Sequence, residues 1–293
     1  MSDAAPAAGA CLVVSVVVHE WCESELARAL VALEASLGLA HEDGRLASAT
    51  VCVLYNGDEA MDEAQARAQL SQWLSWPLAL AAMPDNRGYG AGNNAVLQDA
   101  QRRARTDAVL VMNPDAVLEP GAISAMLWRM ANDPACGLVA PRVLCKDGAH
   151  DRCGCKRYPS VMVLLARLFP VLQRLGRVRA LNARYEYRDM RPDWPQRDVE
   201  LCSGCCLLAS MALWRELKGF DARYFLYFED FDLSLRARYR GRVNLYEPAA
   251  RVRHAGGSVA CKDWRHRWWF IRSAWRFFTA HGWRPWRVGR PQR

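Results

Sequence analysis

The stretch Cys11-Leu-Val-Val-Ser-Val-Val-Val18 indicates the fold of this chain. It is apolar almost throughout, so polar and apolar positions do not alternate. A strand of this kind is expected in a parallel sheet whose two faces are both covered by helices. Four leucines follow at helical spacing, at positions 26, 30, 33 and 37, and a second apolar run covers residues 50–55. The sequence therefore predicts a β-α-β unit.

The same alternation of helix and strand continues along the chain. We expect helices at 61–76 and 95–104 and strands at 78–83 and 107–112, which makes this half a doubly wound, Rossmann-like α/β sheet. In open sheets of this type the ligand lies beyond the carboxyl ends of the strands. The polar residues expected at those ends are His19, Asn56, Asn86 and Asn113.

A glycine-rich segment, Asp85-Asn-Arg-Gly-Tyr-Gly-Ala-Gly-Asn-Asn94, lies between the third and fourth strands. Glycines let backbone N–H groups approach an anion, and the N-terminus of a following helix favours negative charge. A phosphate group of a ligand would fit here. The candidate contacts are Asn86, Arg87, Gly88, Gly92 and Asn93. A polar loop with a helix cap at Asn93 or Asn94 explains the same pattern, and no Walker Gly-Lys-Ser/Thr follows.

Asn113-Pro-Asp115 follows the fourth strand and brings a carboxylate to the same edge of the sheet. Mg²⁺ or Mn²⁺ needs only one or two protein carboxylates when substrate phosphates supply the other oxygens. Asp115 is therefore a candidate metal ligand. Asn-Pro-Asp is also ordinary turn chemistry, which is the competing interpretation.

The composition limits the class of protein. The chain has 293 residues and 52% hydrophobic residues, which allows one or two globular domains. Its net charge of +8 favours an anionic partner, either a phosphorylated metabolite, an acidic membrane surface or nucleic acid. No basic start with a long apolar core precedes the first strand, so we expect a cytoplasmic protein with mostly reduced thiols among its eleven cysteines.

Three carboxylates follow an aromatic run in the segment 223–233, Arg-Tyr-Phe-Leu-Tyr-Phe-Glu-Asp-Phe-Asp-Leu. Aromatic neighbours exclude water from Glu229, Asp230 and Asp232, which raises a carboxyl pKa toward the range that a general base requires. Acidic residues are also common at helix N-termini, and a helix is expected from Leu233 onward. The segment alone fits both interpretations.

The C-terminal segment 262–293 has nine Lys or Arg residues against one acid, Asp263, and six of the twelve tryptophans. Such a composition suits the headgroup layer of a membrane, stacking on single-stranded nucleic acid, or an amphipathic helix packed on the domain. We expect the packed helix, with its basic face toward anionic lipid.

Five motifs in this order resemble the inverting family-2 glycosyltransferases of the GT-A fold, especially the bacterial rhamnosyltransferase-like branch. The resemblance covers most of residues 12–258. The motifs are Asn86-Arg-Gly-Tyr-Gly-Ala-Gly-Asn-Asn94, Asn113-Pro-Asp-Ala116, Gly219-Phe-Asp221, Phe225-Leu-Tyr-Phe-Glu-Asp-Phe-Asp-Leu233 and His254-Ala-Gly-Gly-Ser258.

The resemblance implies a domain organisation. A flexible N-terminus, 1–10, precedes one GT-A domain, 11–260, which has a mixed, mostly parallel sheet with helices on both faces. Within it, residues 11–145 form the nucleotide-sugar half, 146–200 a partly helical variable insertion, and 201–260 the acceptor and catalytic half. A basic, aromatic helical tail, 261–293, follows.

The resemblance also implies roles for individual residues. Asn113-x-Asp115 is similar to the family's metal-binding Asp-x-Asp, and His254 is similar to its downstream metal ligand for Mg²⁺ or Mn²⁺. Asp230 matches the catalytic base, with Glu229 in support. Two departures bear on the choice of donor: Tyr55 replaces the usual Asp after the second strand, and His19-Glu-Trp21 replaces the usual Thr/Tyr-Asn after the first.

The implied reaction moves a sugar from a nucleotide diphosphate to an acceptor hydroxyl with inversion. Rhamnose from dTDP-rhamnose is the first expectation for the donor, and a lipid-linked or polysaccharide acceptor in cell-surface glycan synthesis is the first expectation for the partner. The protein is then expected in the cytoplasm, peripherally at the inner face of the plasma membrane. Two other classes stay open: a non-catalytic protein that binds membrane or, less favoured, nucleic acid, and a metal-dependent nucleotidyltransferase that releases pyrophosphate.

Overall fold

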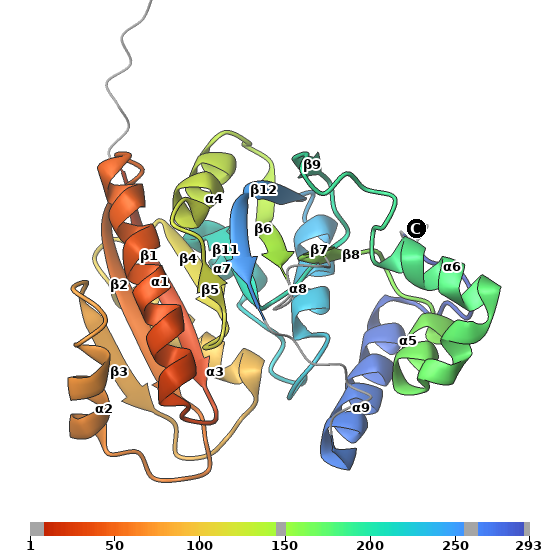
Figure 1. Cartoon of the computed structure of the whole chain (residues 1–293), viewed down its shortest axis with the longest axis horizontal. Coiled ribbons are helices and arrows are strands. Elements are labelled where there is room, and N and C mark those ends of the chain that lie inside the picture. Colours follow the sequence, from red (N-terminus) through yellow and green to blue (C-terminus); the bar gives the residue numbers. More distant parts are fainter. Residues whose placement is uncertain (1–8, 145–150, 255–262, 290–293) are drawn as a thin grey trace, which may run out of the picture.

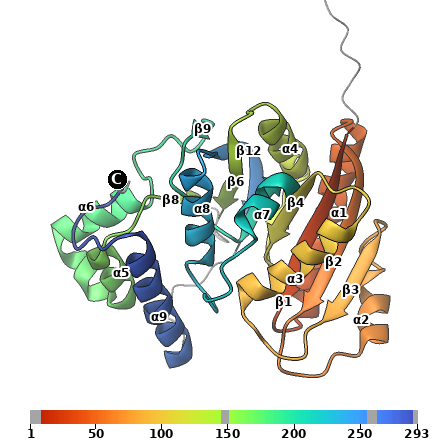
Figure 2. The ribbon, with the colours of Figure 1, turned by 180° about the vertical axis from the view of Figure 1, so that it is seen from behind.

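The computed structural model describes residues 9–144, 151–254 and 263–289. A mixed sheet of ten strands forms the centre of the molecule, with strand order β3-β2-β1-β4-β11-β6-β12-β5 and with β7 and β9 paired at its side. Helices lie on both faces of this sheet, as Figure 1 and the reverse view in Figure 2 show. This is the α/β architecture that the sequence predicts.

The first half of the sheet is parallel. Its elements are β1 (Ala10–Val18), α1 (Glu23–Glu42), β2 (Leu46–Tyr55), α2 (Glu63–Leu70), β3 (Leu78–Ala82), α3 (Tyr89–Arg102) and β4 (Ala108–Met112). Strand β1 pairs with β2 on one side and with β4 on the other, and every residue from 12 to 18 is buried. The predicted β-α-β unit is confirmed.

The second half interleaves an antiparallel strand. Its elements are β5 (Val117–Leu118), α4 (Ala122–Ala131), β6 (Cys136–Leu144), β7 (Asp151–Cys153), β11 (Cys206–Ser210), α7 (Met211–Leu217), α8 (Glu229–Tyr239) and β12 (Val243–Arg253). Strand β11 lies between β4 and β6 and is antiparallel to both, whereas β12 is parallel to β6.

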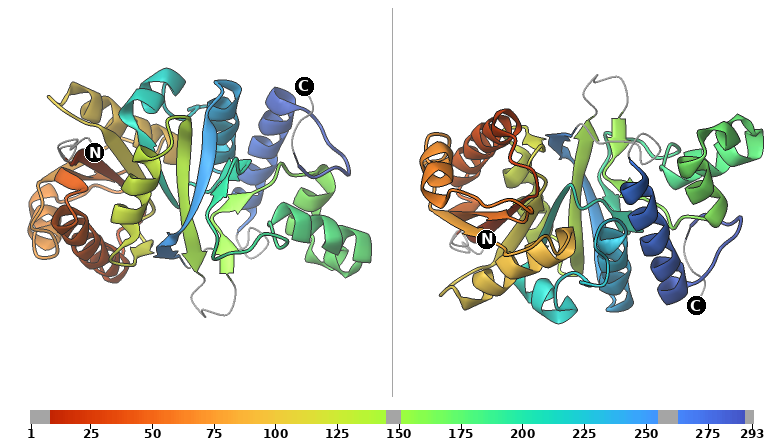
Figure 3. Two further views of the ribbon diagram at one scale, coloured as in Figure 1. Left: turned by 90° about the horizontal axis from the view of Figure 1, so that it is seen from above. Right: turned by 90° about the horizontal axis from the view of Figure 1, so that it is seen from below.

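The remaining elements lie at or beside this end of the sheet (Figures 1 and 3). They are β8 (Cys155–Lys156), α5 (Val161–Leu168), the 3₁₀ helix η1 (Pro170–Arg174), α6 (Gly176–Tyr185), β9 (Gln196–Arg197), β10 (Leu201–Cys202) and α9 (Trp264–His281). The expected insertion is indeed partly helical. Among the residues that the structure describes, no helix is long and apolar enough to cross a membrane.

Three apolar clusters hold these layers together. The first joins α1, α2 and α4 to one face of the sheet, and the second joins α3, α7 and α8 to the other. The third lies under α9, where Phe270, Phe277 and Phe278 pack against Tyr158, Tyr224 and Phe228. The packed C-terminal helix that the sequence predicts is thus present.

Several predicted boundaries are wrong. Helix α2 ends at Leu70 rather than at residue 76, α3 starts at Tyr89 rather than at 95, and α8 starts at Glu229 rather than at 233. Residues 201–210 form two strands, β10 and β11, separated by a turn at 203–205, and residues 243–253 form one strand, β12. Residues 1–8 of the expected flexible N-terminus lie outside the described residues.

Candidate active site

The carboxylate of Asp230 lies in the first turn of α8. Tyr227 and Phe228 have φ angles of 70° and 68°, in the left-handed region that side chains rarely adopt, and this turn sets the direction in which the helix starts. Oδ2 of Asp230 accepts a hydrogen bond of 2.8 Å from the backbone N–H of Gly204, and Oδ1 accepts one of 2.8 Å from Phe231 N–H. The two interpretations of this segment, a general base and an acid at a helix N-terminus, therefore apply to the same residue, Asp230.

Burial raises the pKa values of both Asp230 and its neighbour Glu229. Loss of water raises the pKa of Asp230 to about 6, although its backbone hydrogen bonds act in the opposite direction. Glu229 is only 5% exposed, and its Oε2 has no hydrogen-bond partner within the described part of the chain. Burial first, and then the charge of Asp230, raise the pKa of Glu229 as well. Since Asp230 has N–H donors to stabilise its charge, Asp230 ionises and Glu229 keeps its proton.

The third acid of the segment, Asp232, has a structural place. Its Oδ2 accepts a 2.6 Å hydrogen bond from Nε of Arg236, and its Oδ1 lies 2.8 Å from Nε2 of His281. The guanidinium of Arg236 also donates hydrogen bonds to the backbone oxygens of Leu217 and Gly219. Asp232 therefore ties α8 to α9 and to the loop after α7.

Asp115 and His254 meet at the ends of β4 and β12. The Nε2 atom of His254 lies 3.3 Å from Oδ1 of Asp115 and 3.1 Å from Nδ2 of Asn113. Asp115 and Asn113 precede His254 by 139 and 141 positions. Strands β4 and β12 run in the same direction, so the residues that follow them meet at one edge of the sheet. The remainder of the predicted motif after His254 lies outside the described residues.

The contacts of His254 fit a divalent cation. Nε2 without a proton and the Asp115 carboxylate each offer a lone pair, so both atoms can serve as ligands of one cation. Two ligands at about 2.1 Å in octahedral geometry are about 3.0 Å apart, close to the observed spacing. No group of three or more His, Cys, Asp or Glu residues that could hold a metal occurs within 9–144, 151–254 and 263–289. Oxygens of substrate phosphates can complete the shell of such an ion.

The turn at Ser203–Cys205 connects the two acidic positions. The pKa of the Cys205 thiol is raised to about 11, first by burial, against a lowering by the hydrogen bond with Ser203, and also by the nearby charges of Asp230 and Asp115. The carbonyl of Cys205 accepts a 2.9 Å hydrogen bond from Asn113 N–H, while the adjoining Gly204 N–H reaches Asp230. Asp115, His254 and Asp230 thus lie around one turn at one edge of the sheet.

A buried amide organises the opposite side of this edge. Nδ2 of Asn56 donates to Oδ1 of Asn86 at 3.3 Å and to the carbonyl of Gly88 at 3.0 Å, and its Oδ1 accepts from Arg87 N–H at 3.1 Å. Asn56 therefore holds the loop before α3 in place. The side chain of His19, just after β1, is exposed, and the carbonyl of His19 lies close to Gly57 in the loop after β2.

The start of α3 joins this loop to the acidic turn. Gly88 has a φ of 88°, and a Cβ there would lie 2.1 Å from the carbonyl oxygen of Phe225, so only glycine fits. The N–H of Tyr89 donates to that same carbonyl at 3.0 Å, and its hydroxyl donates to the carbonyl of Gly204 at 2.6 Å. Burial raises the pKa of Tyr89, so the phenol stays protonated and donates.

Two predicted phosphate contacts lie inside α3 instead of in a loop. Gly92 is buried, and a Cβ there would come within 2.8 Å of Val17. Asn93 is fully buried, accepts a 2.7 Å hydrogen bond from Ser15 and donates to the carbonyl of Tyr89. In this structure both residues hold α3 against the sheet, and Gly88 is buried as well, which leaves Asn86 and Arg87 as the accessible part of the motif.

The replacement of the usual Asp by Tyr55 has a structural consequence. Tyr55 is 7% exposed and packs edge-to-face on Trp21, with ring centroids 6.4 Å apart. A Cβ on Gly57 would lie 2.3 Å from the Tyr55 hydroxyl. The tyrosine therefore forms one wall of the loop after β2 and requires glycine two residues later.

Sequence reasoning missed Tyr89 and Gly204. Both touch the acidic turn, but the sequence pattern around Tyr89 fits a polar loop and Gly204 stands outside the five motifs. The Ser203-Gly204 dipeptide is itself a turn signal, and it could have indicated the break between β10 and β11.

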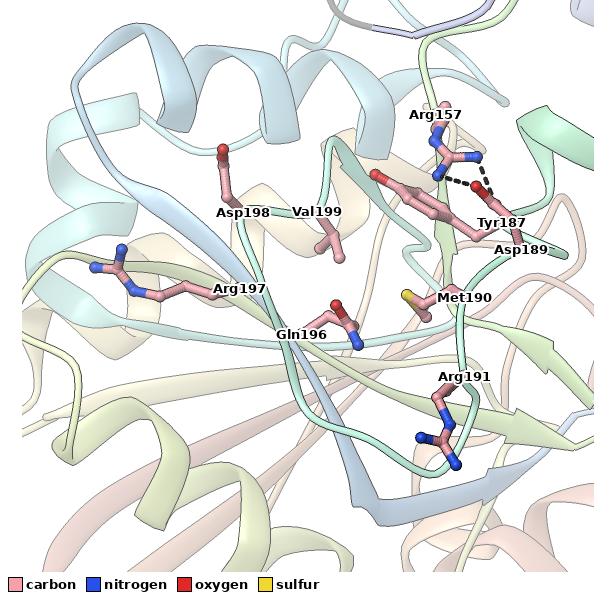
Figure 4. A pocket seen from close by; sticks show the side chains of 9 residues that line it. All are labelled: Arg157, Tyr187, Asp189, Met190, Arg191, Gln196, Arg197, Asp198 and Val199. Atoms are coloured by element: carbon pink, nitrogen blue, oxygen red, sulfur yellow. Dashed lines mark hydrogen bonds and ion pairs between the residues drawn. The ribbon is translucent and has the colours of Figure 1, made fainter.

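A separate cavity of about 320 Å³ lies away from these residues, between the segment after α6 and β9 (Figure 4). Two of its arginines are paired with acids. Arg157 bonds both oxygens of Asp189, and Arg197 bonds Asp133. The guanidinium of Arg191 stacks on Trp194. None of the predicted site residues lines this cavity.

The fold and this edge define the GT-A architecture of glycosyltransferases. The family model described as "Glycosyltransferase like family 2" matches residues 13–270, so the chain belongs to that family.

Curated relatives include rhamnosyltransferases. The N-acetylglucosaminyl-diphospho-decaprenol L-rhamnosyltransferase of Mycobacterium tuberculosis is 34% identical over 183 residues, which cover 58% of this chain and 56% of that protein. The rhamnosyltransferase WbbL of Escherichia coli is 26% identical over 201 residues, 66% of this chain and 70% of that protein. The match to the first of these spans little more than half of its length.

Solved structures share the fold at low identity. The mannosyltransferase PcManGT of Pyrobaculum calidifontis, solved with GDP-Man and Mn²⁺, has a TM-score of 0.52 at 16% identity and covers 92% of this chain and 62% of that one. GalNAc-T7, solved with UDP, GalNAc and Mn²⁺, has a TM-score of 0.56 at 12% identity and covers 84% of this chain and 43% of that one.

Proposed function

We propose that this protein is an inverting glycosyltransferase that moves a sugar from a nucleotide diphosphate to an acceptor hydroxyl. The observation that carries the proposal is the position of Asp230, a buried carboxylate held by Gly204 at the edge where Asp115 and His254 meet. An enzyme of this class needs a base and an anion-stabilising group on either side of one sugar, and this edge supplies both. We further propose that residues 11–260 are one catalytic domain and 261–293 a tail.

Asp230 is the proposed base. Its pKa of about 6 lies close enough to neutrality that the carboxylate is ionised at pH 7 and still takes a proton from an attacking hydroxyl. Glu229 remains neutral beside it, so a second negative charge does not oppose the ionisation of Asp230. The Gly204 and Phe231 N–H groups fix the carboxylate, which leaves the remaining lone pairs for the acceptor.

Asp115 and His254 are the proposed ligands of a Mg²⁺ or Mn²⁺ ion. A bound divalent cation neutralises the charge that develops on the departing diphosphate. Asn113 lies beside the imidazole, with its Nδ2 3.1 Å from Nε2 of His254. On the donor side, we propose that His19, Asn56, Asn86, Arg87, Gly88 and Asn113 shape the nucleotide and phosphate sites. Gly92 and Asn93 would support that loop from inside α3.

The relatives suggest the substrates. By analogy with the two rhamnosyltransferases, rhamnose from dTDP-rhamnose is the proposed donor, and a lipid-linked or polysaccharide acceptor in cell-surface glycan synthesis is the proposed partner. Tyr55 and the His19-Glu-Trp21 segment would set the shape of the nucleotide-binding end. Such an acceptor places the protein in the cytoplasm at the inner face of the plasma membrane.

A panel of nucleotide sugars tests the proposal. Each is added with Mg²⁺ or Mn²⁺, and the melting temperature and the released nucleotide are measured. A ligand at 100 times its Kd stabilises the native state by about 2.7 kcal/mol, which raises Tm by several degrees. We expect one donor to stabilise the protein only with metal and to release a nucleoside diphosphate. Release of pyrophosphate would instead identify a nucleotidyltransferase.

Matched variants locate the metal. Asp115→Asn and His254→Ala should each remove the metal-dependent part of the Tm shift. Asp99→Asn, an exposed acid on α3, should leave it unchanged. Metal dependence that persists in both site variants would place the ion elsewhere.

A further inference from the structure

Helix α9 has two faces of opposite character. One face is buried and carries Phe270, Ser273, Ala274, Phe277 and Phe278. The other carries large apolar side chains in the open: Trp264 is 73% exposed, Trp268 58%, Ile271 47% and Trp275 66%. We name these four residues the tryptophan stripe.

The spacing of the stripe puts its members in one line. Positions 264, 268, 271 and 275 differ by four, three and four residues, so their side chains share one face of the helix, about 120° around its axis from the centre of the buried face. Arg265 and Arg272, seven residues apart, flank this line on the same side and are both exposed. The guanidinium of Arg265 lies 5.9 Å from the ring centre of Trp264.

Charge and shape together identify what this face fits. Residues 263–289 contain six arginines and one acid, Asp263. Tryptophan and arginine side by side suit the boundary of an anionic bilayer, where the rings lie at headgroup depth and the cations meet lipid phosphates. A second copy of the same face would bring arginines against arginines. A single nucleic-acid strand is usually held in a groove, whereas the stripe lies along the outer side of a helix.

The inner side of the same helix touches the segment that carries Asp230. Trp269 packs on Phe225 with ring centroids 4.7 Å apart, Oγ of Ser273 donates to the carbonyl of Leu226 at 2.8 Å, and Nδ1 of His266 lies 3.0 Å from the hydroxyl of Tyr227. The helix therefore lies between the proposed base and whatever covers the stripe. Figure 1 shows α9 on the far side of α8 from the β1–β3 end, with α5 and α6 beyond it.

We infer that the tryptophan stripe, with Arg265 and Arg272, docks the protein on an anionic lipid surface. The surface then lies next to the turn that leads to Asp230, where a lipid-linked acceptor presents its hydroxyl. The benefit to transfer rests on the proposed function, whereas the lipid binding itself does not.

Sedimentation with vesicles tests the inference. The full chain, without donor or acceptor, is mixed with vesicles of phosphatidylcholine alone or with 30 mol% phosphatidylglycerol, at low and high salt. We expect binding to the anionic vesicles that salt weakens. Arg265→Glu with Arg272→Glu should weaken it by about 30-fold or more, because each basic residue near such a surface contributes about 1 kcal/mol. Trp264→Ser, Trp268→Ser and Trp275→Ser together should weaken it by at least about tenfold.

Two control variants separate the role of the stripe from the general effects of net charge and of exposed tryptophan. Arg28→Glu with Arg102→Glu makes the same change in net charge on exposed positions of α1 and α3, and Trp128→Ser removes a tryptophan that is 45% exposed on α4. Both should bind vesicles like the unaltered protein. The altered residues are exposed, so unchanged melting temperatures should confirm that all variants fold.

Several results would overturn the inference. They are equal vesicle binding by the stripe variants and the controls, a dimer in solution that the stripe variants disrupt, or oligonucleotide binding that depends on the stripe while vesicles are not bound. Asp230→Asn distinguishes this failure from failure of the proposed function, since it should lower the rate of transfer by about 10²–10⁴-fold and leave vesicle binding unchanged.

Discussion

The backbone N–H of Gly204 donates a 2.8 Å hydrogen bond to Oδ2 of Asp230, a residue 26 positions further along the chain. The carbonyl of the same glycine accepts the hydroxyl of Tyr89 at 2.6 Å. The N–H and the carbonyl of Gly204 are therefore both hydrogen-bonded. The orientation of the proposed base, Asp230, thus depends on a residue outside its own helix. This dependence leads to the predictions that follow.

Asp230→Asn should lower kcat by about 10²–10⁴-fold, the usual contribution of a general base, and should leave donor binding nearly intact. The variant should be at least as stable as the unaltered protein at pH 7.5, because it removes a buried charge. Turnover and Tm measured together check this. A rate close to that of the unaltered protein would exclude Asp230 from the mechanism.

The pH–rate profile should show a rise through about pH 6. The base acts in its ionised form, and burial sets the pKa of Asp230 at about 6, so kcat/KM should increase about tenfold per pH unit below that value and level off above it. Initial rates from pH 4.5 to 8 measure the profile. The residual activity of Asp230→Asn should lack this step, whereas a step that persists there would belong to another group.

Glu229→Gln should change how stability depends on pH. Burial raises the pKa of Glu229 in the native state above that in the unfolded chain, so the native state binds this proton more tightly. The unaltered protein therefore loses stability as pH rises from about 4.5, the unfolded value, toward the native one. The variant escapes this loss. Its Tm should exceed that of the unaltered protein at pH 8, by about 2–4 °C for each kcal/mol, and the two should converge near pH 4.5. A gap that does not vary with pH would contradict a buried, neutral Glu229.

Gly204→Val should reduce kcat by about 10²-fold. A Cβ on Gly204 would lie 3.2 Å from Cβ of Asp230 and 3.5 Å from Cε1 of Tyr89, so a branched side chain must displace one of them. A displacement of about 1 Å in a catalytic group can cost this much. Gly121→Ala is the control, since a Cβ there would meet nothing within 4 Å. Full activity in Gly204→Val would show that the hydrogen bond to Asp230 does not position it.

The buried parallel strands were predictable because each reads as a continuous apolar run. The runs Cys11–Val18 and Ala108–Met112 each predict a strand without knowledge of the rest of the fold, since helices cover both faces of these strands. The start of α3 was not predictable in this way. Tyr89 enters the helix because Gly88 can adopt a φ of 88° beside Phe225, and that contact joins residues 137 positions apart.

Some residues of the candidate site could likewise be predicted from local sequence, whereas others could not. The acids Asp115 and Asp230 follow from motifs that occupy short stretches of sequence. The role of Gly204 depends on the turn between β10 and β11, which exists because Leu201–Cys202 pairs with β8 while Cys206–Ser210 pairs with β4. Pairing of that kind is a property of the assembled sheet, so local periodicity does not contain it.

The place of β11 between β4 and β6 has a consequence for biosynthesis. Met112 ends β4, and its partner Cys206 emerges from the ribosome 94 residues later. At about 5–20 residues per second this takes roughly 5 to 19 seconds, during which one edge of β4 has no partner from its own sheet. Unpaired strand edges invite association with other chains. We therefore expect truncated forms that end before residue 200 to aggregate, and nascent chains of that length to be substrates for chaperones.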